Sequence, residues 1–296
     1  MSQSGAAPAA YDRRVTPARP DIAAHHLRGM VEAARYVEPR IETVIAEVAD
    51  VKREPSFAAP LDTQAIRGEI IHVYEVEEGW AWGQLQSDGY VGYLPAALLA
   101  PAGPGATHRV KVQRTFLYPG PSMKLPVERA FPLNAQVHVD HVEGEFSRVG
   151  QEGFVWSGHL DELNMFEPDF VAVAERFLGV PYLWGGKSPL GVDCSGLIQT
   201  SLAAAGISAP RDTDMQEKAL GEALDQKLIG SGGLRRGDLV FWKGHVGVMR
   251  DSETLLHANG YHMQAASEPL QSAIQRIAAK SFGQITSVRR LAKKAA

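Results

Sequence analysis

The strongest constraint on the fold is a repeat of about 63 residues in the first half of the chain. Both copies contain short runs of β-branched and aromatic residues separated by turns that contain glycine. The sequence Asp-Gly-Tyr-Val-Gly-Tyr at residues 88–93 has its counterpart in Glu-Gly-Phe-Val-Trp at residues 152–156. A duplicated unit of this size and strand content predicts two small all-β barrels, which we place at residues 41–101 and 105–164.

Different patterns flank the repeat. In residues 1–40 we expect a loose arm and then a short helix from Asp21 to about Tyr36, because Asp21 can cap a helix and apolar residues recur at helical spacing. In residues 165–296 helical periodicity precedes strand-like runs, which is typical of an α+β domain. There we predict one helix over about 168–178 and another from about Cys194 to Ala205. Strands are predicted near residues 238–242, 245–249, 254–258 and 285–290.

Composition excludes several classes of protein. The chain has 296 residues and a formal net charge of -4, which argues against a general nucleic-acid binder. Its single cysteine, Cys194, excludes an intrachain disulfide framework and a multi-cysteine metal cluster. No apolar run approaches the ~18 residues of a membrane-spanning helix. The first residues also lack the pattern of a secretory signal, so we expect a cytoplasmic protein.

Cys194 stands where a helix is predicted to begin, since Pro189 and Gly191 mark a loop just before it. Unpaired N–H groups and the helix dipole at such a position stabilise a thiolate and lower the thiol pKa. The N–H of Cys194 can also donate to an oxyanion. The alternative is a small buried structural cysteine, which would gain nothing from this position.

A thiolate nucleophile needs a base and a group that orients the base. His245 opens one predicted strand and His257 lies at the end of the next. If the turn between them is centred near residue 251, the two residues face each other, and His257 can hydrogen-bond one nitrogen of His245 while the other faces Cys194. Two structural histidines, or a metal site, are the alternatives. No acidic ligand stands at a suitable spacing, so we expect neither a metal nor another cofactor.

Four motifs in order resemble those of the NlpC family of papain-like cysteine peptidases, which cleave bacterial cell-wall peptides. They lie at residues 177–186, 193–197, 236–248 and 256–258, and the resemblance extends over about residues 165–292. The two predicted barrels resemble bacterial SH3 domains. The whole arrangement is similar to that of the γ-D-glutamyl-L-diamino-acid endopeptidases. The resemblance therefore implies an α+β, papain-like catalytic domain preceded by two SH3-like barrels.

The resemblance also implies a role for individual residues. Cys194 matches the nucleophile, His245 the general base and His257 the residue that orients the base. Tyr182 matches a tyrosine that completes the oxyanion hole, although a core aromatic is the alternative. The residues that match substrate contacts are Asp193, Ser195, Asp212, Thr213, Tyr90 and Glu54.

Three of these substrate contacts concern a free amine. The resemblance implies that Asp193 pairs with the α-amine of an N-terminal L-Ala, and a helix N-cap is the alternative role. Tyr90 and Glu54 would contribute to the same pocket from the first barrel. Their alternatives are a barrel aromatic and a solvated loop charge.

These expectations define one function. We expect hydrolysis of the γ-D-glutamyl–diamino-acid bond in murein peptides of the form L-Ala-γ-D-Glu-diamino acid, during peptidoglycan recycling. An amidase or acyltransferase with the same Cys/His/His site is one alternative, and a cell-wall-binding protein is another. No nucleic-acid partner is expected, and the sequence makes no prediction of oligomeric state.

Overall fold

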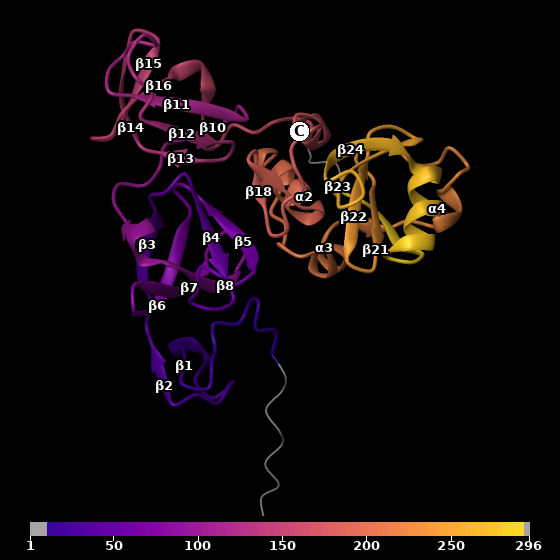
Figure 1. Cartoon of the computed structure of the whole chain (residues 1–296), viewed down its shortest axis with the longest axis horizontal. Helices are drawn as coiled ribbons and strands as arrows, with labels where there is room; N and C mark the ends of the chain where they lie inside the picture. The colour runs from indigo at the N-terminus through magenta and orange to yellow at the C-terminus, as the bar shows by residue number, and fades with distance from the viewer. Residues whose placement is uncertain (1–10, 293–296) are drawn as a thin grey trace, which may run out of the picture. The chain divides into compact units, whose positions relative to one another are not determined.

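Residues 11–292 are described by the computed structural model, and the chain divides into two units after Gly105 (Figure 1). Residues 1–10 of the predicted arm and residues 293–296 of the predicted catalytic domain lie outside the described part. The first unit contains one large sheet and a short N-terminal pair of strands. The second unit contains a further β domain and then the mixed α+β domain.

The helix predicted from Asp21 to about Tyr36 is wrong. That segment forms strand β1 (Ile22–Ala24), a 3-10 turn (His25–Leu27) and strand β2 (Arg35–Val37), which is parallel to β1. All three residues of β1 are fully buried, and Ile22 packs against Tyr74 and Trp82. A surface helix buries only one stripe of its side chains, so three consecutive residues are not all buried in it. In a strand, side chains point to both sides, and here both sides of β1 are covered.

The first unit is built on a seven-stranded antiparallel sheet with the order β5-β4-β8-β7-β6-β3-β9. In β6 the buried Ile71 and Val73 alternate with more exposed residues, as expected for strands with one face on a core. This confirms the prediction of a small β domain. The strands are β3 (Arg40–Val44), β4 (Val48–Lys52), β5 (Leu61–Ile66), β6 (Ile70–Glu77), β7 (Trp80–Leu85), β8 (Val91–Pro95) and β9 (Leu99–Pro101).

The second β domain ends in the same way as the first. A 3-10 turn (Ser157–His159) and strand β17 (Leu160–Glu162) follow its last hairpin, just as a 3-10 turn (Ala96–Leu98) and β9 close the first sheet. Two sheets form this domain, with the orders β13-β10-β17 and β12-β11-β16-β15-β14. The other strands are β10 (His108–Val110), β11 (Arg114–Tyr118), β12 (Arg129–Pro132), β13 (Gln136–Val137), β14 (Val139–Glu143), β15 (Phe146–Val149) and β16 (Gly153–Trp156).

The α+β domain places a six-stranded antiparallel sheet between helices α2 (Cys194–Ala204) and α4 (Leu270–Lys280), as Figure 1 shows. Leu197 of α2 packs against Val246 and Val248, while Ile277 of α4 packs on the opposite face. The sheet order is β20-β25-β21-β22-β23-β24. Its strands are β20 (Glu222–Ala223), β21 (Leu239–Trp242), β22 (His245–Met249), β23 (Thr254–Asn259), β24 (Gln264–Pro269) and β25 (Ile285–Arg290).

The predicted second helix and the predicted strands are confirmed in this domain. Helix α2 begins at Cys194, and Gly206, with a φ of 68°, follows its end. The first predicted helix is present but shorter, as α1 (Phe170–Glu175). The remaining elements are β18 (Lys187–Ser188), β19 (Gly191–Val192), α3 (Thr213–Ala219) and a 3-10 turn (Gln226–Leu228).

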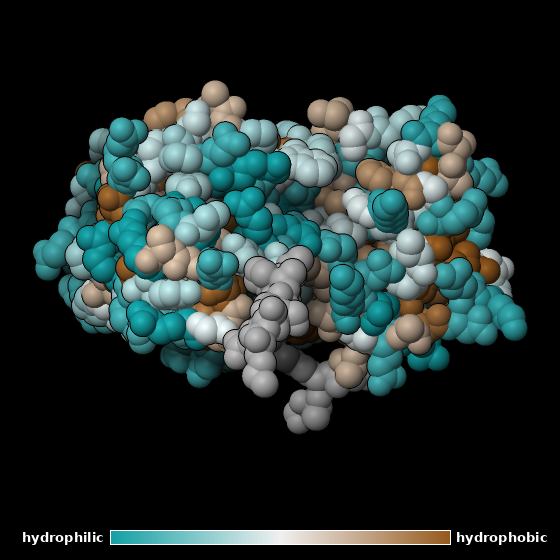
Figure 2. Space-filling view, turned by 90° about the horizontal axis from the view of Figure 1, so that it is seen from below, coloured by the Kyte–Doolittle hydropathy of each residue, from teal (hydrophilic) through white to brown (hydrophobic). Residues whose placement is uncertain are grey.

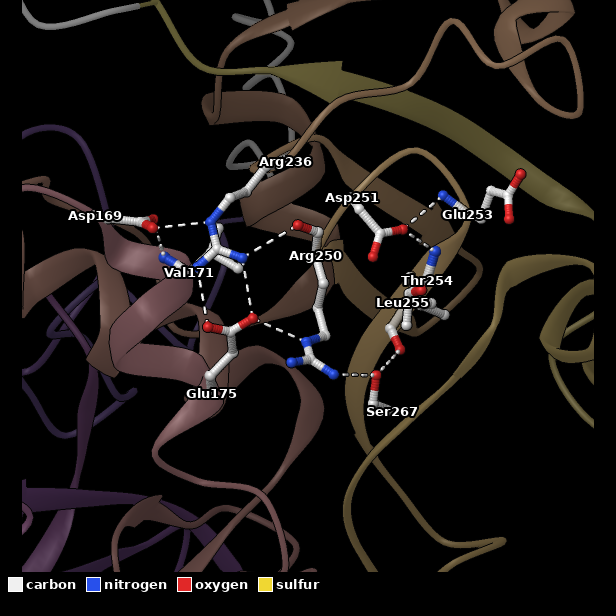
Figure 3. Close-up of polar contacts among 10 residues, drawn as sticks. All are labelled: Asp169, Val171, Glu175, Arg236, Arg250, Asp251, Glu253, Thr254, Leu255 and Ser267. Atoms are coloured by element: carbon white, nitrogen blue, oxygen red, sulfur yellow. Dashed lines mark hydrogen bonds and ion pairs between the residues drawn. The ribbon is translucent and has the colours of Figure 1, made fainter.

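A tight turn sets the register between β22 and β23. Oδ1 of Asp251 accepts hydrogen bonds from the N–H groups of Glu253 and Thr254, at 2.8 and 2.7 Å (Figure 3). The strand pair that follows joins Val248 to Leu256 and Met249 to Leu255, so the turn is centred on residue 252. The predicted centre at 251 is therefore wrong by one residue. Asp251 lies before the centre, and its side chain fixes the turn by accepting the two N–H groups that follow the centre.

The same turn is tied to the rest of the domain by ion pairs. The guanidinium groups of Arg236 and Arg250 both bind the carboxylate of Glu175 in α1, and Arg250 also donates to Oγ of Ser267 in β24 (Figure 3). Arg236 adds a bond to Asp169, the N-cap of α1. This network fixes helix α1 to the end of the hairpin that carries both histidines.

On the face shown in Figure 2, hydrophobic residues lie in small groups among hydrophilic residues. Among the described residues, no helix has the length and apolar character needed to cross a membrane. The apolar residues are instead gathered in the cores of the separate domains.

Candidate active site

Cys194 is the first residue of α2, and the local sequence explains this position. Asp193 is the N-cap, and its Oδ1 accepts the N–H of Gly196 at 2.7 Å. Gly196 lies so close to the preceding loop that a Cβ there would be 2.1 Å from the carbonyl oxygen of Gly186. The cap and this close approach together hold the start of α2 against that loop, and Cys194 is buried there.

The thiol lies against two hydrogen-bonding groups. Sγ of Cys194 is 3.7 Å from Oγ1 of Thr213, and it also receives the backbone N–H of Val246 at the start of β22. Burial nevertheless raises the pKa of Cys194 to about 11, with a further contribution from the negative charge of Asp193. The expectation of a lowered pKa is wrong, because the cost of burying a thiolate outweighs the favourable end of the helix.

His245 and His257 form the hydrogen-bonded pair that was predicted. Nε2 of His245 lies 2.8 Å from Nδ1 of His257, and both side chains are buried. The ring of His245 stacks on Phe282 at 5.1 Å between centroids. Burial, and then the neighbouring His257, hold the pKa of His245 well below its usual value. The imidazole is therefore neutral at physiological pH and can accept a proton.

The two histidines are not directly opposite each other, so that part of the prediction is wrong. Extending the observed register places His257 opposite Gly247, two positions from His245. The three residues still share one face of the sheet, because they differ by even steps along the strands. A Cβ at Gly247 would lie 3.2 Å from Cβ of His257, so the glycine leaves room for the ring.

The thiol lies at the start of β22, the strand that begins with His245. The thiol lies at the N–H of Val246, and His245 is the residue immediately before it. Within residues 11–292, no hydrogen bond joins Sγ of Cys194 to the imidazole of His245. The structure thus brings Cys194, Thr213, His245 and His257 to the amino end of one strand.

Tyr182 lies beside the same end of α2. It pairs with Val192 of β19 in an isolated bridge and is half-buried against the core that contains Cys194. Burial raises the pKa of the Tyr182 phenol, and the carboxylate of Asp193 and a thiolate at Cys194 raise it further. The hydroxyl therefore stays protonated and is able to donate a hydrogen bond, as its predicted role in an oxyanion hole requires.

Asp193 is held by more donors than the N-cap alone. Its two oxygens accept hydrogen bonds from the guanidinium of Arg211, at 3.0 and 2.7 Å, and Gly185 donates its N–H at 2.8 Å. Ser195 bonds to Asp193 and also accepts from Arg211. Arg211 is 1 % exposed, so this is a buried ion pair. The N-cap role of Asp193 is present in the structure, and its role toward a substrate amine stays a prediction.

Arg211 and Glu268 have structural roles at this site that the sequence did not reveal. Arg211 directly precedes Asp212, the N-cap of α3, and Thr213, its first residue. Its only signal in the sequence is its place directly before the predicted substrate contacts Asp212 and Thr213. Glu268 lies in β24, and its Oε1 is 2.8 Å from Nε2 of His257. Arg276 of α4 forms an ion pair with the same carboxylate.

A metal ion has one possible set of ligands among the described residues. The side chains of His257, His262 and Glu268 have their ligand atoms within 4.8 Å of one another. However, Glu268 is already shared by His257 and Arg276, and a cation there would face the guanidinium charge of Arg276. We therefore assign this group to hydrogen bonding with His257.

Tyr90 and Glu54 belong to the first unit. Tyr90 is buried and forms part of the core of that sheet, with Leu85 and Leu94, while Glu54 is exposed in the loop after β4. Both raise the pKa of Arg53 electrostatically, so they lie at the same end of the sheet. Their roles as substrate contacts stay predictions.

A cysteine at the start of a buried helix, in contact with the strand that begins with one of two hydrogen-bonded histidines, is the arrangement of a papain-like cysteine peptidase domain. Residues 179–280 match the NlpC/P60 family, and residues 51–99 match the bacterial dipeptidyl-peptidase SH3 domain. The chain belongs to the NlpC/P60 family. A crystal structure of an NlpC/P60 family protein from Bacillus cereus shares the fold with a TM-score of 0.70 at 20% identity, over 84% of this chain and 99% of that one.

Three relatives of similar sequence are named dipeptidyl-peptidases. A γ-D-glutamyl-L-lysine dipeptidyl-peptidase of Bacillus subtilis is 31% identical over 67% of this chain and 72% of its own length. Another of that name, from Bacillus cereus, is 27% identical over 62% of this chain and 61% of its own length. A dipeptidyl-peptidase 6 of Lysinibacillus sphaericus is 35% identical over 34% of this chain, which spans only 35% of that relative.

Proposed function

We propose that this protein hydrolyses the γ-D-glutamyl–diamino-acid bond of murein peptides that carry a free N-terminal L-Ala. The observation that carries the proposal is the buried thiol of Cys194 at the N–H of Val246, the residue that follows a neutral His245, which is itself hydrogen-bonded to His257. The names of the two Bacillus relatives, γ-D-glutamyl-L-lysine dipeptidyl-peptidases, support this choice of bond.

In this proposal Cys194 and His245 are both uncharged before the substrate reacts. His245 takes the proton of Cys194 as sulfur attacks the γ-carbonyl carbon, and the N–H of Cys194 and the hydroxyl of Tyr182 bind the oxyanion. The imidazolium then gives its proton to the amine of the departing diamino acid as the carbon–nitrogen bond breaks. Water, deprotonated by His245, hydrolyses the thioester and releases L-Ala-D-Glu.

The free amine defines which peptides are substrates. We propose that Asp193 attracts the ammonium of L-Ala while Arg211 holds the carboxylate in place. Thr213 contacts the thiol, Ser195 bonds to Asp193, and Asp212 directly precedes Thr213. Peptides whose L-Ala is still acylated would be excluded, which suits the degradation of released murein peptides in recycling within the cytoplasm.

A defined tripeptide tests the proposal. L-Ala-γ-D-Glu-L-Lys and its N-acetyl form are incubated separately with the full chain, and L-Ala-D-Glu release is followed by mass spectrometry. We expect cleavage of the free tripeptide and a large loss of rate on acetylation. Equal rates would refute the requirement for the amine, and release of a different fragment would refute the assigned bond.

Adding an amine acceptor such as glycinamide separates hydrolysis from acyl transfer. A peptidase gives mainly the free dipeptide, whereas an acyltransferase gives mainly the glycinamide adduct. The same assay with the meso-diaminopimelate tripeptide determines which diamino acid is preferred.

A further inference from the structure

A chain of hydrogen bonds continues beyond the two histidines to α4. Nε2 of His245 bonds to Nδ1 of His257, and Nε2 of His257 bonds to Oε1 of Glu268, each at 2.8 Å. Arg276 of α4 closes the chain with an ion pair to that same oxygen. His257 is fully buried and Glu268 is largely buried, so solvent does not readily replace any of these partners.

The carboxylate of Glu268 determines which nitrogen of each histidine carries the proton in this series of hydrogen bonds. An ionised carboxylate only accepts hydrogen bonds, so His257 must donate from Nε2. In neutral His257 the other nitrogen, Nδ1, then carries a lone pair and accepts from Nε2 of His245. Neutral His245 is left with its lone pair on Nδ1, the nitrogen that is free to take the proton of Cys194.

Arg276 keeps this end of the chain ionised and in place. Burial alone would favour the neutral carboxylic acid, but the bonds from His257 and Arg276 lower the pKa of Glu268. A protonated Glu268 would donate a hydrogen bond to His257 and could reverse the donor and acceptor roles along this series of hydrogen bonds. The guanidinium prevents this reversal.

We propose that Glu268 is a positioning residue, which fixes the tautomer of His257 and through it presents the unprotonated Nδ1 of His245 to the thiol. The inference rests on the proposed peptidase function for its role in turnover. The assignment of tautomers does not depend on any substrate. When His245 becomes an imidazolium during the reaction, the charge of Glu268 stabilises it through His257.

The first test measures protons in the wild-type protein and needs no activity. Long-range proton–nitrogen NMR of the chain labelled with ¹⁵N-histidine distinguishes the two tautomers, with His245→Gln and His257→Gln used for assignment. At neutral pH we expect both rings to be neutral and protonated on Nε2. A ring of His257 protonated on Nδ1, or a positively charged His257, would overturn the proposal.

The second test removes the charge but keeps the shape. In Glu268→Gln the amide oxygen can still accept from His257 and Arg276, whereas Glu268→Leu removes the acceptor altogether. We expect kcat/KM on the tripeptide to fall roughly 10- to 100-fold in the first variant and further in the second, with KM little changed. Glu253→Gln, at the exposed hairpin turn, is the matched control and should retain full activity. A Glu268→Leu variant as active as this control would overturn the proposal.

The pH profile separates positioning from a merely structural role. The charged or titratable groups around the two rings are His262 in the loop before β24, Glu268 in β24 and Arg276 in α4. Loss of the Glu268 charge should move the acid limb of kcat/KM to lower pH, and Arg276→Gln should move it to higher pH. Unmoved limbs in both variants would overturn the proposal. If the wild-type chain does not cleave the tripeptide, the proposed function fails, while the NMR result still decides the tautomers.

Discussion

Nε2 of His245 lies 2.8 Å from Nδ1 of His257, although the two residues are two positions out of register on neighbouring strands. The diagonal contact is made over Gly247, the residue that the register places opposite His257. The orientation of the base therefore depends on a position that has no side chain.

Gly247→Ala should displace His257. The added Cβ would meet Cδ1 of Leu255 at 2.8 Å and Cβ of His257 at 3.2 Å, and overpacking of this kind costs about 1–3 kcal/mol. We expect a loss of tripeptide turnover of at least tenfold, with a modest fall in Tm. Wild-type turnover in this variant would show that the placement of His257 does not limit the reaction.

The thiol should not behave as a preformed thiolate. Burial raises the pKa of Cys194 to about 11 and lowers that of His245, so both groups are neutral near pH 7. Alkylation by uncharged iodoacetamide in the absence of substrate should therefore be slow at pH 7 and rise steadily to pH 9.5. A rate that is already constant between pH 5 and 8 would indicate an ion pair of thiolate and imidazolium instead.

Thr213 should assist ionisation of the thiol. Its hydroxyl lies 3.7 Å from Sγ and lowers the pKa of Cys194, so Thr213→Val removes a bond worth about 1 kcal/mol. We expect kcat/KM to fall roughly three- to tenfold and the alkylation profile to move to higher pH. Thr213→Ser keeps the hydroxyl and serves as the control. Equal profiles for the valine and serine variants would rule out this role.

Arg211 should matter mainly for stability. Arg211→Met leaves the carboxylate of Asp193 buried without its cation, which typically costs about 3–5 kcal/mol. Urea unfolding measures this loss. Arg236→Met removes the more exposed ion pairs of Figure 3 and should cost only about 1 kcal/mol. Similar losses in the two variants would contradict the importance that we assign to the buried pair.

Local patterns in the sequence were sufficient to predict the elements that carry the chemistry. A loop ending at Gly191 and an apolar run after it located the start of α2 at Cys194, and short runs of apolar residues located β21 and β22. The sequence correctly predicted that His245 and His257 lie on one face of the sheet. It did not predict the register of their two strands, because the side chain of Asp251 sets the turn between them.

Tertiary burial accounts for what the sequence could not show. The pKa of Cys194 depends on the strands packed over it, and the contact between Glu268 and His257 depends on the pairing of β23 with β24. The buried Arg211 reaches Asp193 across 18 positions in the chain. The N-terminal segment resembled a helix, yet it folds as strands because the first unit buries all of Ile22–Ala24.

The most direct test of the account is the release of L-Ala-D-Glu from L-Ala-γ-D-Glu-L-Lys by the Cys194→Ala variant. Removing Sγ leaves the cap of α2, the Arg211–Asp193 pair and the histidine chain unchanged, so the variant should fold with nearly the wild-type Tm. We expect release by the wild-type chain and none above background by Cys194→Ala. Release by the variant at the wild-type rate would contradict it.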